Sequence, residues 1–80
     1  MKIHIQYFAI FRQQRGLSQE DKEISENTSA KTLYNDLAKK NGFKLSVDSI
    51  RVAINDHFTS INEILRDGDH IVFIPPVSGG

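Results

Sequence analysis

The chain has 80 residues and no cysteine, and ten Lys and Arg residues balance ten Asp and Glu residues. A chain of this length forms one modest core but neither a second domain nor a deep enclosed active site, so an enzyme with its own pocket is not expected. The balanced charge lacks the basic excess that nucleic-acid binding requires, and the lack of cysteine excludes disulfides, a thiol nucleophile and a thiolate metal site.

The N-terminal stretch "MKIHIQYFAIF" alternates in polarity over residues 2–8. One face carries Ile3, Ile5 and Tyr7, and the other carries His4, Gln6 and Phe8. A period of two is typical of a strand with one buried face. No small-residue cleavage site follows this stretch, and no apolar run in the chain approaches the ~18 residues of a membrane span. We therefore expect a cytoplasmic protein that makes no membrane contact.

The next two segments are predicted to be a loop and a short strand. Gly16 and the polar residues 18–21 indicate the loop, and residues 21–25 indicate a strand at the edge of a sheet, paired with the first strand as a hairpin.

The clearest helix is predicted at residues 29–40. Its apolar residues recur at helical spacing and form one stripe: Ala30, Leu33, Tyr34, Leu37 and Ala38. Thr28 or Ser29 can cap the start of the helix, and Asn41 and Gly42 supply a left-handed stop.

The second half of the chain reads as three strands. Residues 49–55 alternate, the turn at Asn55 and Asp56 leads into a short return strand ending at residue 60, and residues 61–65 are expected to form a brief helical turn. A further turn at residues 67–69 precedes the last strand, and the proline pair ends it.

This order of elements indicates the fold class. Strand, strand, helix, strand, strand, strand predicts an α+β roll of the ubiquitin-like, β-grasp kind, with a mixed sheet of four or five strands and one main helix packed on one face. Residues 1–76 are expected to form this domain, and residues 77–80 a flexible C-terminal tail. The helix stripe is expected to pack on the apolar strand residues Ile3, Ile5, Val52, Ile54, Ile71 and Phe73.

The chain ends "IPPVSGG", with Gly79 and Gly80 as its last residues. A terminal Gly-Gly arises by chance in roughly 0.5% of chains, because Gly is about 7% of residues. Together with "YFAIFR", "VAIN" and "LRDGDHIVFIPPVSGG", this ending resembles the MoaD family, the small subunits of molybdopterin synthase, across essentially the whole chain. The related ThiS carriers of thiamine synthesis share the fold and the Gly-Gly but usually lack the double proline.

The resemblance implies a non-catalytic sulfur carrier for molybdenum cofactor biosynthesis. A MoeB-like activating enzyme would use ATP to adenylate the C-terminal carboxylate of Gly80, and a sulfur donor would convert the adenylate to a thiocarboxylate. A MoaE-like large subunit, which holds the active site, would receive the tail and pass the sulfur to cyclic pyranopterin monophosphate. The chain itself would bind no cofactor, and two small and two large subunits would form a heterotetramer.

The residue types of the tail suit this role. Gly79 and Gly80 have no Cβ, so the tail can pass through a narrow channel. Pro75 and Pro76 favour extended geometry and lack an amide N–H, so the tail is expected to project from the sheet. The residues expected to form the tail and its root are Pro75, Pro76, Val77, Ser78, Gly79 and Gly80.

A docking surface is predicted beside the root of the tail. Because the first and last strands of such a sheet are neighbours, Phe8, Val72 and Ile74 are expected to form an exposed apolar patch that binds the partner. Arg12 matches a basic residue of the family and could pair with a carboxylate on a partner. Gln13 stands where the family has an acidic residue, and Ile74 where it has a second aromatic residue.

Several alternatives remain open from the sequence. Phe8 could instead form a small cluster with Phe11, and Arg12 could be a simple surface charge. The chain could also be a sulfur carrier for thiamine synthesis or tRNA thiolation, or a ubiquitin-like modifier whose Gly80 forms an isopeptide bond.

Other polar residues are expected to have no functional role. His4, His57 and His70 lack metal-ligand spacing and are predicted to lie on the surface. Asp67 and Asp69 lack the remaining ligands of a calcium loop, so a plain turn is predicted there.

Overall fold

The computed structural model describes residues 1–76 of the chain. Its elements are β1 (Lys2–Tyr7), α1 (Ala9–Arg15), β2 (Gln19–Glu23), α2 (Ala30–Asn41), the 3₁₀ turn η1 (Val47–Ser49), β3 (Arg51–Ile54), β4 (His57–Thr59) and β5 (His70–Ile74). Within these residues, no helix has the length and apolar character needed to cross a bilayer.

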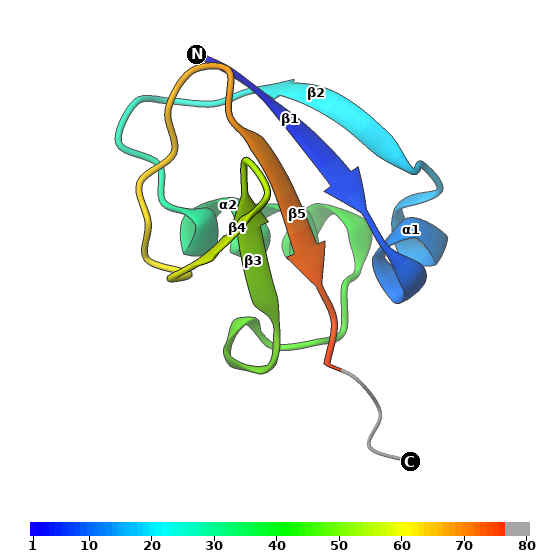
Figure 1. Cartoon of the computed structure of the whole chain (residues 1–80). Helices are drawn as coiled ribbons and strands as arrows, with labels where there is room; N and C mark the ends of the chain where they lie inside the picture. Colours follow the sequence, from blue (N-terminus) through cyan, green and yellow to red (C-terminus); the bar gives the residue numbers. More distant parts are fainter. Residues whose placement is uncertain (77–80) are drawn as a thin grey trace.

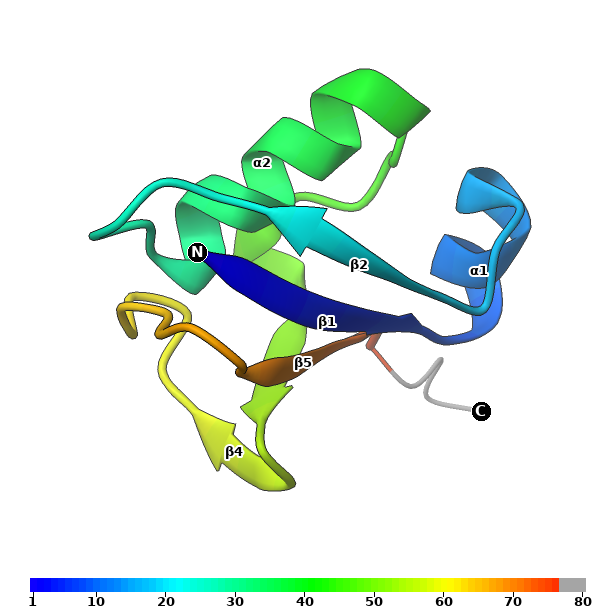
Figure 2. The same cartoon turned by 90° about the horizontal axis from the view of Figure 1, so that it is seen from above.

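The five strands form one mixed sheet in the order β2-β1-β5-β3-β4. The central pair, β1 and β5, is parallel, and the other pairs are antiparallel. Helix α2 lies across one face of the sheet, and no helix of the described residues covers the opposite face (Figures 1 and 2). We call that opposite face the outer face. The β-grasp arrangement and the neighbouring first and last strands are therefore confirmed.

The core lies between the sheet and α2. Every strand residue predicted to face the helix is buried except Ile54, which is partly buried, and the helix stripe is buried except Ala38, which is partly buried. Burying each large apolar side chain contributes about 1.5–3 kcal/mol, so this interface supplies most of the favourable free energy of folding.

Helix α2 begins and ends as its sequence predicts. Ser29 is the N-cap, and its Oγ accepts a hydrogen bond from the backbone N–H of Thr32 at 3.1 Å. Gly42 has a φ of +72° and ends the helix, and its backbone N–H donates to the carbonyl of Ala38 at 2.8 Å. A residue with a Cβ is strained in this left-handed conformation, so glycine is favoured at this stop.

Helix α1 was not predicted, because the sequence analysis assigned no structure to residues 9–15. The helix has only seven residues, too few to be stable alone, and tertiary packing holds it. Phe11 is fully buried, and its ring centroid lies 5.1 Å from that of Phe43 and 5.7 Å from that of Tyr34. Gly16, with a φ of +82°, ends the helix.

Strand β2 lies two residues earlier than predicted, at Gln19–Glu23 in place of residues 21–25. Its register with β1 pairs Gln6 with Gln19 and Lys2 with Glu23. The inward positions of β2 hold the polar residues Glu20 and Lys22, so no apolar alternation marks the strand in the sequence.

Residues 61–65 were predicted to form a helical turn, and this prediction is wrong. The segment makes a single hydrogen-bonded turn and then an isolated bridge between Ile64 and Ser29. The carbonyls of Ile61 and Glu63 accept hydrogen bonds from the backbone N–H groups of Lys31 and Ala30, at 2.7 and 2.9 Å. The first turn of α2 leaves such N–H groups without partners inside the helix, and after its single turn the segment runs alongside the helix start and supplies them.

Candidate functional site

The candidate site begins where β5 leaves the sheet. This strand lies between β1 and β3, and Ile71 and Phe73 hold it in the core with no exposed surface. The next residue after the strand, Pro75, is partly buried and Pro76 is exposed. Figure 1 shows that β5 ends at the edge of the molecule opposite the N-terminus. Pro75 and Pro76 therefore leave the sheet from a central strand whose inward side chains are fully buried.

Four residues of the predicted tail, Val77, Ser78, Gly79 and Gly80, lie outside the described residues. Their assigned roles, including the carboxylate chemistry at Gly80, stay predictions.

The structure places the predicted apolar patch on the outer face, beside the proline pair. Phe8 follows β1 directly and is 47% exposed, while Val72 and Ile74 are partly buried on the outward side of β5. Tyr7 pairs with Phe73 in the parallel register of β1 and β5, so the residues that follow them, Phe8 and Ile74, correspond in the same register. Phe8 is therefore exposed, whereas Val72 and Ile74 are only partly exposed, and the formation of one partner-binding patch by the three stays a prediction.

The alternative cluster of Phe8 with Phe11 does not form as a separate unit. Phe11 joins the main core on the inner side of the sheet, whereas Phe8 is exposed as the N-cap residue of α1. The two rings therefore lie in different environments although they are three residues apart.

Phe58 is a patch residue that the sequence analysis missed. Its side chain is 68% exposed on β4, where Phe58 pairs with Ala53, and Ala53 pairs with Val72. The turn at Asn55 and Asp56 sets this register, with φ values of +52° and +71°. Strand parity across that turn could have found Phe58, because it places Phe58 on the same face as Ala53. We call Phe8, Phe58, Val72 and Ile74 the outer patch.

Arg12 lies on α1 and is exposed. It forms no ion pair within residues 1–76. Its position near the end of β1 leaves both the partner-binding and the simple surface interpretation open, and its role stays a prediction.

A polar cluster occupies the other side of β1, at its edge with β2. The hydroxyl of Tyr7 donates to Glu20 Oε2 at 2.6 Å, and Arg15 donates to both carboxylate oxygens of Glu20, at 2.7 and 2.9 Å. The bidentate hydrogen bond from Arg15 lowers the pKa of Glu20, because it favours the charged carboxylate. Burial, and then the bond to Glu20, raises the pKa of Tyr7. The cluster satisfies its own charges and is best explained as structural.

The histidines on β1 and β5 form a second polar group, on the outer face. His4 Nδ1 lies 2.7 Å from Asp21 Oδ1, and His70 Nε2 lies 3.1 Å from Gln6 Oε1. The hydrogen bond to Asp21 raises the pKa of His4. Within residues 1–76 no group of three or more His, Cys, Asp or Glu side chains could hold a metal ion.

The acidic turn after residue 66 is a plain turn, as predicted. Asp67 Oδ1 accepts a hydrogen bond from the backbone N–H of Lys2 at 2.7 Å, and Asp69 Oδ2 accepts one from the N–H of Arg66 at 2.8 Å. The carboxylates therefore bind the backbone of the chain and hold the loop in place.

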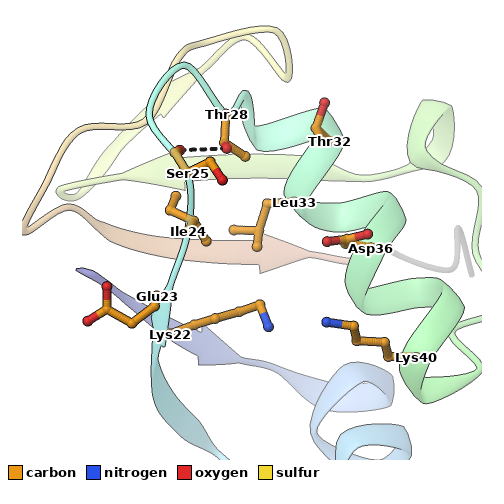
Figure 3. Close-up of a pocket in the computed structure, with 9 residues that line it drawn as sticks. All are labelled: Lys22, Glu23, Ile24, Ser25, Thr28, Thr32, Leu33, Asp36 and Lys40. Atoms are coloured by element: carbon orange, nitrogen blue, oxygen red, sulfur yellow. Dashed lines mark hydrogen bonds between the residues drawn. The ribbon is translucent and has the colours of Figure 1, made fainter. Parts of the chain in front are cut away.

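A hollow of about 520 Å³ lies between β2, the loop after it and α2 (Figure 3). The amino groups of Lys22 and Lys40 point toward one another across it, with the Asp36 carboxylate alongside on α2. The residues that line the hollow carry charges of both signs and include none of the proline root. This hollow shares no residue with the outer patch or the proline root and is not part of the candidate site.

Comparisons with known proteins agree with this arrangement. The model of the ThiS family matches residues 5–80. The molybdopterin synthase sulfur carrier subunit of Mycobacterium tuberculosis is 27% identical over 82 residues, which cover 100% of this chain and 99% of that protein.

Two solved structures are also similar. "Putative molybdopterin converting factor, subunit 1" from Pyrococcus furiosus is 32% identical, with a TM-score of 0.82 over 96% of this chain and 99% of that one. A chain of the protein-protein complex of subunits 1 and 2 of molybdopterin-converting factor from Helicobacter pylori 26695 is 28% identical, with a TM-score of 0.66 and full coverage of both chains.

Proposed function

Because the chain belongs to the ThiS family of small sulfur carriers, we propose that it is the sulfur carrier subunit of a molybdopterin synthase. One observation carries the proposal: the central strand β5 ends in a proline pair beside an exposed apolar patch, in a chain that closes with Gly-Gly. The full-length similarity to a sulfur carrier subunit of that synthase supports the specific assignment.

The proposed chemistry takes place at the carboxylate of Gly80. A carboxylate is a poor electrophile, so an activating enzyme first uses ATP to form the acyl-adenylate and releases pyrophosphate. A sulfur donor then supplies a hydrosulfide equivalent that displaces AMP and leaves a thiocarboxylate. The thiocarboxylate is anionic near neutral pH and is a much better nucleophile than the carboxylate.

The sulfur is proposed to leave the chain in the active site of the large subunit. There the thiocarboxylate attacks the pterin precursor, and hydrolysis of the resulting acyl bond returns Gly80 to a carboxylate. Two rounds supply the two sulfurs of the dithiolene that holds molybdenum. The chain contributes the projecting carrier group and the docking surface, and the partner contributes the catalytic residues.

The structure of residues 1–76 supports a role in which the partner supplies the active site and this chain supplies the carrier group. Phe58 and Ile74 of the outer patch line a hollow together with Pro75 and Pro76, and the patch gives a partner apolar area to bury. Pro75 lacks an amide N–H, so the β5 ladder cannot extend in the usual way past Ile74. A partner bound to the patch would therefore receive the tail in a defined direction.

Intact mass spectrometry of the protein isolated from its own cells tests the proposal. We expect a population whose mass is greater by the difference between sulfur and oxygen. Deletion of Gly80 should abolish that population and leave the unfolding midpoint unchanged, whereas the matched variant Ser78→Ala should retain the population. A Gly80 deletion that unfolds the protein would show that the tail is part of the fold.

Two other functions are separated by the fate of the sulfur. Transfer from the purified thiocarboxylate to a thiazole precursor or to tRNA, with no transfer to the pterin precursor, would favour the other carrier roles. Finding the chain only as conjugates on lysine side chains would favour the modifier role and contradict both carrier roles.

A further inference from the structure

Two shallow hollows flank the proline pair at the root of the tail. One has a volume of about 430 Å³ and lies against α1 and the loop that follows Phe43, and the other has a volume of about 440 Å³ and lies against β3 and β4. Pro75 and Pro76 line both hollows, so the proline pair forms the ridge between them.

Each hollow contains one charged residue, and in both cases it is a cation. Lys44 is the charged residue of the first hollow and Arg51 that of the second, and no acidic residue lines either one. Both residues are exposed. Within residues 1–76 neither cation forms an ion pair. Arg51 does not pair even with Asp48, the acidic residue closest to it in the sequence.

Arg51 is held over the outer patch. It pairs with Ile74 across the ladder between β3 and β5, and the Arg51 Cζ lies 5.9 Å from the centre of the Phe58 ring. A guanidinium over an aromatic face is attracted to the negative face of the ring, which limits the directions that the side chain can take. The guanidinium therefore stands beside the apolar surface that a partner would cover.

Docking on the outer patch has an electrostatic consequence for these two cations. A partner that covers the proline ridge and both hollows beside it removes water from Arg51 and Lys44. An unpaired charge that loses its water destabilises a complex strongly. Aromatic contact with Phe58 offsets only part of that cost. The complex therefore requires an anionic group on each side of the tail.

We propose that the partner which receives the tail presents acidic side chains on both sides of its channel entrance, one facing Lys44 and one facing Arg51. This inference rests on the proposed function, since it takes the large subunit as the partner. The two ion pairs would straddle the proline ridge and set the angle at which the tail enters the channel. They would also speed association at low salt, because opposite charges steer the encounter.

The test measures binding of the full-length chain to the large subunit from the same organism, by titration calorimetry at low and high salt. We expect Arg51→Glu and Lys44→Glu each to raise the Kd about 30-fold or more. The matched control, Lys31→Glu on the exposed side of α2, should bind like the original chain. Circular dichroism should show equal unfolding midpoints for all variants, since each substituted residue is exposed.

Two further variants separate charge from contact. Arg51→Leu keeps the apolar contact with Phe58 and removes the charge, so it should also weaken binding and reduce the salt dependence of the Kd. Acid-to-lysine substitutions at the channel entrance of the large subunit should restore affinity for the Arg51→Glu chain.

The outcomes distinguish the two proposals. Tight binding of the original chain with unchanged affinity in Arg51→Glu and Lys44→Glu would overturn the inference and leave the proposed function standing. A failure of the original chain to bind the large subunit would overturn the proposed function, and the inference with it.

Discussion

The outer patch and the Glu20 cluster lie on opposite sides of β1, and they differ in how their side chains are satisfied. Around Glu20, a hydroxyl and a guanidinium supply three hydrogen bonds to one carboxylate, so the cluster is complete within the chain. Around Pro75, the exposed Phe58 and the cations Lys44 and Arg51 line the two hollows, and neither cation forms an ion pair within the described residues. Residues of the first region should therefore affect stability, and residues of the second should affect binding.

The largest expected effect is on stability, and it distinguishes two phenylalanines that are three residues apart, Phe8 and Phe11. Phe11→Ala should lower the free energy of unfolding by about 3–5 kcal/mol, because it leaves a cavity in the core. Phe8→Ala removes an exposed ring and should lower it by less than about 1 kcal/mol. Urea denaturation of both variants checks this contrast, and equal losses would show that Phe8 belongs to the core.

The next effect concerns binding. Phe58→Ser should raise the Kd for the large subunit about 30-fold, which is typical of an aromatic residue near the centre of an interface. The unfolding midpoint should change little, because the ring is exposed in the isolated chain. Leu17→Ser is the matched control, since Leu17 is 42% exposed but lies in the loop before β2. Equal binding by both variants would remove Phe58 from the interface.

A smaller effect is expected from the Glu20 cluster, on stability alone. Glu20→Gln removes the charge that Arg15 and Tyr7 hold, and should lower the free energy of unfolding by about 1–2 kcal/mol near neutral pH. Affinity for the large subunit should not change. Glu23→Gln on the same strand is the control, because Glu23 is 74% exposed and its only ion pair within residues 1–76, with the N-terminal amino group, is 3.7 Å long.

The pH dependence of stability gives a second measurement on Glu20→Gln. Arg15 lowers the pKa of Glu20 in the folded chain, so the contribution of Glu20 is present above the ordinary pKa of a glutamate. That contribution is lost as the pH falls from the ordinary pKa of a glutamate through the lowered pKa of Glu20. Stability measured from pH 3 to 7 should therefore rise less steeply in Glu20→Gln than in the original chain. Parallel curves would mean that the Arg15 pair does not favour the folded state.

The sequence was sufficient where one local pattern agreed with the tertiary structure. Helix α2 has a long apolar stripe, a serine cap and a glycine stop, and all three appear in the structure at the predicted positions. The last strand and its inward pair, Ile71 and Phe73, were predicted in the same way from alternation. In both elements one face is buried, so apolar residues recur at the period of the helix or the strand and mark the element in the sequence.

The sequence was insufficient where distant contacts decide the local structure. Helix α1 is short and is held by the packing of Phe11 on Tyr34 and Phe43, which no local pattern reports. Residues 61–65 satisfy the first N–H groups of α2, thirty residues away, and so do not form their own helical turn. The position of β2 follows from its register with β1.

Some features of the candidate site also follow from local sequence, and others depend on distant contacts. The sequence by itself determined the proline pair, the Gly-Gly ending and the outward parity of Phe8, Val72 and Ile74, because these follow from residue type and strand period. Only the tertiary structure placed Phe58, Arg51 and Lys44 around the root of the tail. Those three residues come from separate elements, and the order in which strands pair brings them together, which is a property of the whole sheet.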